Sequence, residues 1–199
     1  MVKALLTAAV MMMMIGMESA EAQDIRVETF QHVCVEARTN YVASAAAAEA
    51  LGWSPVTEAV RPELQRIFEV SRSFDLGEAS MTRLQAYSRS GYESVFVVLS
   101  EVAMPSQLLN GCYVYDFDAT EPIPSDLFTS LLGSPPNEAI HQAGIITSQK
   151  WIGPERLPNV ATLRVAFIPE GSEAGQIGGF DGIALALTSL SLSTTEESP

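Results

Sequence analysis

Cys34 and Cys112 are the only cysteines of this 199-residue chain, and a bond between them would restrict its fold more than any other feature of the sequence. In an exported protein an even number of cysteines is typical of disulfides, because the periplasm and the extracellular space are oxidising. The bond would close a loop across nearly half of the mature chain, which contributes about 4.5 kcal/mol on the loop-entropy model. A reactive thiol at either position is the alternative interpretation.

The first 22 residues predict export. Lys3 precedes an apolar run from Ala4 to Met17, and the small residues of Ala20-Glu21-Ala22 form the pattern that signal peptidase recognises before Gln23. The apolar run is shorter than the about 20 residues that a membrane-spanning helix needs. We therefore expect a secretory signal peptide at residues 1–22 and a mature protein in the periplasm or the extracellular space.

Length and composition predict one folded domain. Removal of residues 1–22 leaves 177 of the 199 residues, a usual size for a single domain. Apolar residues make up 47% of the chain and charged residues 18%, which is typical of a globular protein rather than a disordered one. We expect residues 23–190 to form one α+β domain and residues 191–199 to form a flexible polar tail.

The excess of acidic residues argues against two classes of partner. The formal net charge is −13, and Lys150 is the only lysine after the predicted signal peptide. Such a surface repels nucleic-acid phosphates and anionic lipids. After residue 22 no apolar stretch reaches the about 18 residues that indicate a membrane helix. We expect a protein or small-molecule partner, no nucleic acid and no stable membrane insertion.

Apolar spacing predicts a helical pair at the start of the mature chain. Apolar residues from Val27 to Ala37 follow each other at intervals of three and four, which is one stripe of a helix. Asn40 is a suitable N-cap for a second helix over 41–51, and Gly52 is a suitable residue to end it. Residues 61–70 are expected to form a shorter helix.

The middle of the chain has the pattern of antiparallel strands. Three strands are expected at 82–87, 93–102 and 112–117, and Asn110-Gly111 is a strong signal for a hairpin turn between the last two. Short turns join antiparallel neighbours, since parallel strands need long crossovers.

The remainder contributes a short helix and two more strands. The helix is expected at 125–132, ending at Gly133, and the strands at 163–168 and 183–190. Residues 171–182 are expected to form a flexible glycine-rich loop, the pattern over 137–159 is ambiguous, and no internal repeat is visible. The predicted architecture is therefore an N-terminal helical pair packed on an antiparallel sheet of about five strands.

One short segment resembles a catalytic motif. The sequence V-Y-D-F-D-A-T at 114–120 resembles the first motif of haloacid-dehalogenase-type phosphohydrolases. By that resemblance Asp116 would be the nucleophile, Asp118 the general acid/base and Mg²⁺ the partner that offsets the charge. Lys150 would stand for the family's lysine and Asp181 for part of its last acidic motif. The resemblance implies a Mg-dependent phosphohydrolase on a doubly wound parallel sheet.

The surrounding sequence favours a different environment for these aspartates. The predicted hairpin makes their strand antiparallel to the preceding one, and the 79 residues after Thr120 lack the alternating strands and helices of a parallel sheet. We expect an antiparallel neighbour and no cluster of Lys150 and Asp181 around Asp116. Extended to Glu121, the segment could instead bind Ca²⁺, although it lacks the glycine and the distal glutamate of an EF-hand loop.

No other motif predicts a cofactor, a metal ion or a nucleophile. His32 and His141 are the only histidines, and the chain contains neither H-E-x-x-H nor G-x-S-x-G. The glycines of 175–179 are not followed by the lysine of a phosphate-binding loop. The sequence therefore favours a protein without catalytic residues.

The arrangement of a few fixed positions resembles small exported bacterial proteins of unknown function. The shared positions are Phe30 and Cys34, then Gly52-Trp53 after an alanine-rich helix, then Gly111-Cys112. The resemblance spans about half of the mature chain and supports the disulfide and the compartment, but it carries no activity. We therefore predict an exported accessory or binding protein, with the phosphohydrolase that uses Asp116 and Asp118 as the alternative.

Overall fold

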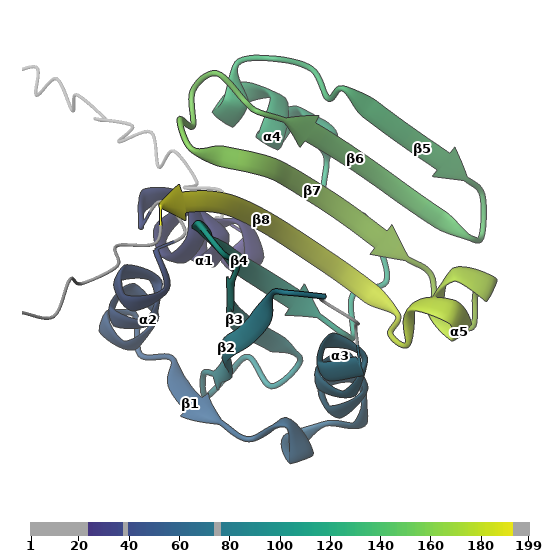
Figure 1. Cartoon of the computed structure of the whole chain (residues 1–199). Helices are drawn as coiled ribbons and strands as arrows, with labels where there is room; N and C mark the ends of the chain where they lie inside the picture. Colours follow the sequence, from purple (N-terminus) through teal and green to yellow (C-terminus); the bar gives the residue numbers. More distant parts are fainter. Residues whose placement is uncertain (1–23, 38–39, 74–76, 193–199) are drawn as a thin grey trace, which may run out of the picture.

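The computed structural model describes residues 24–37, 40–73 and 77–192, which fold around one antiparallel sheet (Figure 1). The predicted signal peptide, its cleavage site before Gln23 and residues 193–199 lie outside the described residues. Within the described residues, none of the helices combines the length and the apolar composition that crossing a membrane requires.

The sheet has eight strands, all antiparallel to their neighbours, in the order β1-β2-β3-β4-β8-β7-β6-β5. The strands are β1 (Ser54–Val56), β2 (Ser80–Ser88), β3 (Val95–Ala103), β4 (Gln107–Asp116), β5 (Glu138–Gln142), β6 (Ile146–Ile152), β7 (Val160–Ile168) and β8 (Gly182–Leu192). The mixed helix-and-sheet class is confirmed, but the expected number of about five strands is wrong.

Strands β1, β5 and β6 are the three that the sequence did not reveal. β1 has only three residues and contains Pro55, which is typical of a break rather than a strand. All five residues of β5 are exposed, so no alternation of apolar and polar residues marks it. β5 and β6 pair through a tight turn at 143–145 and form the hairpin that the ambiguous segment concealed.

The turn between β3 and β4 lies elsewhere than the sequence predicts. Met104 and Gln107 exchange backbone hydrogen bonds of 2.8 and 3.4 Å across the turn, whereas Asn110-Gly111 lies inside β4. A Cβ atom on Gly111 would lie 2.5 Å from both Ser100 Oγ and Tyr113 Oη. Glycine is therefore present because the Tyr113 side chain lies across it, and not because the chain turns there.

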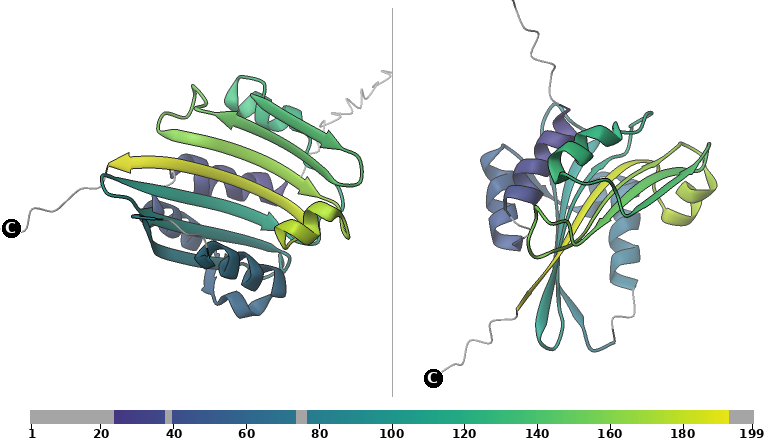
Figure 2. Two further views of the ribbon diagram at one scale, coloured as in Figure 1. Left: turned by 45° about the vertical axis from the view of Figure 1, so that its right-hand side comes forward. Right: turned by 90° about the horizontal axis from the view of Figure 1, so that it is seen from above.

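Three helical segments cover one face of the sheet (Figure 2). They are α1 (Ile25–Thr29) with its π-helical continuation η1 (Phe30–Glu36), α2 (Tyr41–Ala50) and α4 (Ser125–Leu132). The Asn40 side chain caps α2 by accepting a hydrogen bond from the Ala43 amide at 3.1 Å. This face holds the larger core, in which Phe30, Trp53, Phe128 and Trp151 are at most 1% exposed.

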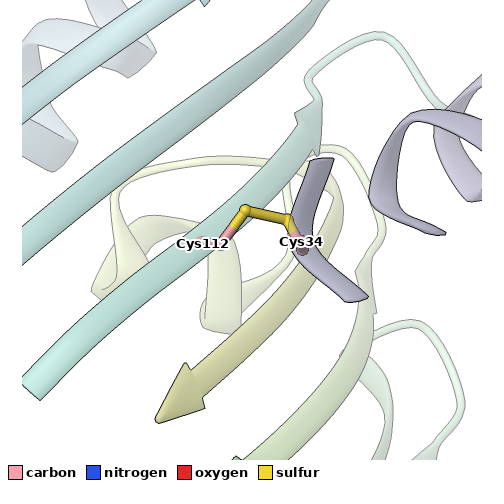
Figure 3. Close-up of a disulfide and its surroundings, with 2 residues drawn as sticks. All are labelled: Cys34 and Cys112. Atoms are coloured by element: carbon pink, nitrogen blue, oxygen red, sulfur yellow. A yellow bond between two sulfur atoms is a disulfide. The ribbon is translucent and has the colours of Figure 1, made fainter. Parts of the chain in front are cut away.

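A disulfide joins this helical layer to the centre of the sheet (Figure 3). Cys34 of η1 and Cys112 of β4 are bonded, with their Cα atoms 5.5 Å apart. The two residues are 0% and 1% exposed, respectively. The predicted pairing is therefore confirmed, and the reactive-thiol alternative is wrong for both positions.

Two further helices lie on the opposite side of the sheet (Figure 2). α3 (Pro62–Ser73), preceded by the 3-10 turn η2 (Glu58–Val60), buries Leu64 and Phe68 against strands β2, β3 and β4. α5 (Glu173–Gly178) lies in the glycine-rich segment that was expected to be a flexible loop. These two helices leave part of this face without a helical cover, as the view from above shows.

The sheet consists of two four-stranded halves, and in each half the strands follow one another from an edge of the sheet to its centre. Strands β1 to β4 and strands β5 to β8 each form a meander that follows a helix, and the two meanders meet where β4 pairs with β8. The helices before the two meanders both end in Leu-Gly, at Leu51-Gly52 and Leu132-Gly133, with glycine φ angles of +83° and +71°. The chain therefore contains a repeat of topology that is not visible in the sequence.

Each half departs from the shared pattern at one place. In the first half α3 is inserted between β1 and β2, where the second half has the tight turn at 143–145. In the second half α5 is inserted between β7 and β8, where the first half has the turn at 104–107. Both insertions are on the side of the sheet opposite α2 and α4 (Figure 2).

Candidate functional site

A groove of about 1020 Å³ lies between the two insertions. It is lined by Pro62, Glu63, Gln65, Arg66 and Glu69 of α3, by Phe117, Asp118, Ala119 and Thr120 after β4, by Phe167 of β7, and by Pro169, Glu170, Gly175, Gln176, Gly179, Phe180 and Asp181 around α5. Phe167 is the only one of these residues on a strand. All the others belong to the two insertions or to the connection between the halves.

Aromatic rings form the floor between the groove and the sheet. The rings of Tyr115 and Phe117 stack with their centroids 5.6 Å apart. The ring of Phe180 meets both of them edge-on, at centroid distances of 5.4 and 6.3 Å. Tyr115 is buried beneath this arrangement, and burial raises the pKa of its hydroxyl. The packed rings give the groove a rigid apolar base.

Carboxylates surround this base. Five lining residues are acidic, namely Glu63, Glu69, Asp118, Glu170 and Asp181, whereas Arg66 is the only lining residue that is basic. The Arg66 side chain is packed against Gly179, at the place that a Cβ on this residue would occupy. The lining of the groove is therefore strongly acidic.

Two of the carboxylates already bind one guanidinium group of this chain, because Arg61 Nε donates to Glu63 Oε2 at 3.3 Å in addition to its contacts with Asp118. Arg61 Nη2 donates to Asp118 Oδ1 at 2.8 Å, and Arg61 Nη1 donates to Asp118 Oδ2 at 3.4 Å. The same guanidinium lies over the ring of Phe117, with its carbon 5.5 Å from the ring centroid. The hydrogen bond to Asp118 raises the pKa of Arg61, so its charge is retained.

Asp116 has a separate environment on the other face of the sheet. Arg26 of α1 reaches it at 3.3 Å and also binds Asp24 at 2.5 Å. Burial alone would raise the pKa of Asp24, but the hydrogen bonds and the charge of Arg26 outweigh it and lower that pKa. Asp116 is thus part of the contact between α1 and β4, and it does not line the groove.

The structure gives the residues of the phosphohydrolase motif separate partners. Asp116 pairs with Arg26 and Asp118 with Arg61, while Lys150 Nζ lies 3.3 Å from Glu138 on the neighbouring strand. Asp181 Oδ2 accepts from the Gly171 amide at 3.2 Å. Strand β4 has an antiparallel neighbour on each side, which confirms the expected direction and contradicts the parallel sheet that the resemblance implied.

The remaining candidate residues do not gather into a site. His32 bonds Glu36 at 2.9 Å on η1, and His141 bonds Thr147 at 3.0 Å between β5 and β6. In the described part of the chain no group of three or more histidine, cysteine, aspartate or glutamate side chains is arranged to hold a metal ion.

The sequence revealed only part of the groove. Its analysis singled out Asp118, Asp181 and the glycine-rich segment, but it missed the contribution of α3, including Glu63 and Arg66. The pattern of α3 predicts a helix with one apolar face, and its polar face is indistinguishable in sequence from an ordinary solvent-exposed surface. No protein-family model, curated protein or solved structure matches this chain.

Proposed function

We propose that this chain is an exported binding protein without catalytic residues of its own, and that the groove between α3 and α5 is its ligand site. The observation that carries the proposal is the origin of the groove. Of its lining residues, all but Phe167 come from the insertions that break the repeated topology or from the connection between the halves. Binding sites are commonly built from loops held by a rigid scaffold.

The size and composition of the groove support this proposal. Its volume of about 1020 Å³ is at the upper end of the about 300–1,000 Å³ that is usual for ligand sites. It combines an apolar floor of Phe117 and Phe180 with charged groups at its rim. A few polar groups around an apolar base are the usual means of orienting a ligand.

The state of the carboxylates favours binding over phosphoryl transfer. A nucleophilic aspartate must be free to attack, whereas Asp116 is paired with Arg26 and Asp118 is held by two hydrogen bonds from Arg61. The buried disulfide supports export, since such bonds persist in oxidising compartments. Turnover of a phosphomonoester by the mature protein that depends on Mg²⁺ and disappears in Asp116→Asn would contradict this interpretation.

A fragment screen followed by NMR tests the location of the site. We expect ligands from a chemically mixed library to shift the amide signals of residues 117–120 and 169–181 of the mature protein. The substitution Gln176→Trp places a large ring on an exposed lining residue of α5 and should abolish these shifts.

Ile177→Trp is the matched control. Ile177 is the next residue of the same helix, is 80% exposed and does not line the groove. This variant should bind as the unmodified protein does. Ligands that bind only at other surfaces, or that bind equally well to both tryptophan variants, would refute the groove as the ligand site.

A further inference from the structure

We infer that the β5 edge of the sheet binds a second copy of this chain, strand β5 to strand β5, about a two-fold axis perpendicular to the sheet. This surface is separate from the proposed ligand site, because no residue of β5 lines the groove. β5 is the outermost strand, and among the described residues β6 is its only partner strand (Figure 1). One side of its backbone therefore presents N–H and C=O groups that can pair with another strand.

β5 lacks the features by which natural sheets protect an edge from pairing. Such features include proline, lysine, bulges and a covering segment. The sequence of β5 is E-A-I-H-Q, its register with β6 is regular, and all five of its residues are exposed. Ile140, at the centre of the strand, is 46% exposed. A β-branched residue at this place favours pairing with a further strand.

The charge of β5 favours an identical strand as the partner. The whole chain has a formal net charge of −13, so two copies repel each other over most of their surface. The only acidic residue of β5 is Glu138, and Lys150 Nζ of β6 lies 3.3 Å from its Oε1. Two copies can therefore approach at β5 with little electrostatic cost, whereas a basic partner would be drawn to acidic surfaces such as the groove.

The centre of the sheet shows the same kind of pairing within one chain. β4 and β8 are the last strands of the two repeated halves, and they pair antiparallel with α2 and α4 on the same face of the sheet (Figure 2). A two-fold axis at β5 would join two copies by the same operation, since it makes identical strands antiparallel and keeps the helices of both copies on one face. Ile140 of one copy would then lie close to Ile140 of the other.

Sedimentation velocity of the oxidised protein comprising residues 23–199 tests the inference. An edge of five residues buries less than the about 1,600 Å² of a standard interface, so we expect a weak dimer whose population rises over about 1–500 µM protein. Because both copies are acidic and the β5 edge is neutral, raising the ionic strength from about 0.05 to about 0.3 M should strengthen the dimer.

Two lysine variants locate the contact. Ile140→Lys should raise the dissociation constant of the dimer at least about tenfold, because it places like charges on neighbouring strands beside the axis. Ile152→Lys is the matched control, since Ile152 is on β6, on the same face of the hairpin as Ile140, and is 49% exposed. This control has the same change of charge and should dimerise as the unmodified protein does. Thermal unfolding of both variants checks that they are folded.

Single added cysteines test the antiparallel arrangement. The residue nearest to the two-fold axis faces its own copy at a Cα separation of about 4.5–5.5 Å, which is within the range that a disulfide spans. One of the variants Ala139→Cys, Ile140→Cys and His141→Cys should therefore give a covalent dimer with diamide, which takes up the two hydrogen atoms of the thiols. Ile152→Cys should remain a thiol.

The outcomes decide between the β5 edge and other contacts. A monomer at every protein concentration would overturn the inference and would leave a strand of a different protein as the occupant to be sought for this edge. Dimers that persist in Ile140→Lys, or that are lost equally in Ile152→Lys, would overturn pairing through β5, because the contact would then lie elsewhere. None of these results bears on the groove, which the fragment screen tests separately.

Discussion

Single residues show how much the surroundings of a glycine decide its role. Gly111 and Gly178 both have φ angles outside the left-handed region, so neither is required by backbone conformation. Gly111 is enclosed by Ser100 and Tyr113, whereas no atom other than those of its chain neighbours and its own helix backbone lies within 4 Å of the position that a Cβ would occupy on Gly178. The two positions therefore form a matched pair for substitution by alanine.

Gly111→Ala is expected to lower the free energy of unfolding by about 1–3 kcal/mol, because the added methyl group forces Tyr113 and Ser100 apart in a packed strand. Gly178→Ala, in the last turn of α5, should leave stability unchanged or raise it by up to about 1 kcal/mol. Urea unfolding of the oxidised proteins measures both values. A neutral Gly111→Ala would mean that Tyr113 moves away at no cost.

At the level of elements, local signals predicted most helices and the central strands. The end of α4 was predicted at its last residue and the end of α2 to within one residue, because a left-handed glycine, Gly133 or Gly52, follows each helix. The wrong hairpin at Asn110-Gly111 has a physical reason, since that glycine is required by a side-chain contact between strands. Exposed β5 was missed because its strand state depends on pairing with β6 and not on its own pattern.

Only parts of the groove could be predicted from the sequence, because contacts between distant segments bring its lining residues together. Asp118 and Asp181 are far apart in sequence, and only the pairing of β4 with β8 brings their segments together. The contribution of α3 depends on which side of the sheet this helix occupies. Neither fact is encoded in the local periodicity of the chain.

The disulfide is expected to resist reduction in the native protein. Cys34 and Cys112 are both buried between η1 and β4. The thiolate of a reducing agent can therefore reach the disulfide only after the protein has unfolded locally or globally. Alkylation after treatment with dithiothreitol, followed by mass spectrometry, should show reduction at the rate of unfolding in native buffer and immediate reduction in denaturant. Labelling of the unfolded, unreduced protein should find no free thiol.

A cysteine-free variant extends this test. Replacement of Cys34 and Cys112 together by alanine should lower the free energy of unfolding by about 2–5 kcal/mol. Fast reduction in native buffer, or an unchanged stability of the variant, would contradict the role of the bond as a tie between helix and sheet.

At the level of the whole molecule, the two meanders share the larger core, and the disulfide ties the helical layer to the sheet within the first half. The larger core combines Phe30 of η1 with Phe128 of α4, which lie in contact with their ring centroids 6.1 Å apart. The disulfide fixes the first helical segment to β4, the strand at which the two halves meet. The two insertions lie on the other side of the sheet, where α3 contributes Leu64 and Phe68 to a second, smaller core.

The predicted compartment is tested on the whole chain. Cleavage after Ala22 should give a mature protein that begins at Gln23, because signal peptidase recognises the small residues Ala20 and Ala22. Intact-mass measurement of protein recovered from outside the cytoplasm should show the loss of residues 1–22. Recovery of the full mass, with Met11 to Met14 retained, would contradict export by this route.

The two outer strands have a consequence for association. β1 offers three residues interrupted by Pro55, whereas β5 offers five exposed residues without proline. A sheet grows into a fibre only when each added chain presents a fresh edge that accepts the next one. If two chains joined through β5, both would be left with only the β1 edge, so growth would stop at a closed pair. Pro55 removes a backbone N–H donor from the β1 edge, which disfavours the pairing of a further chain there.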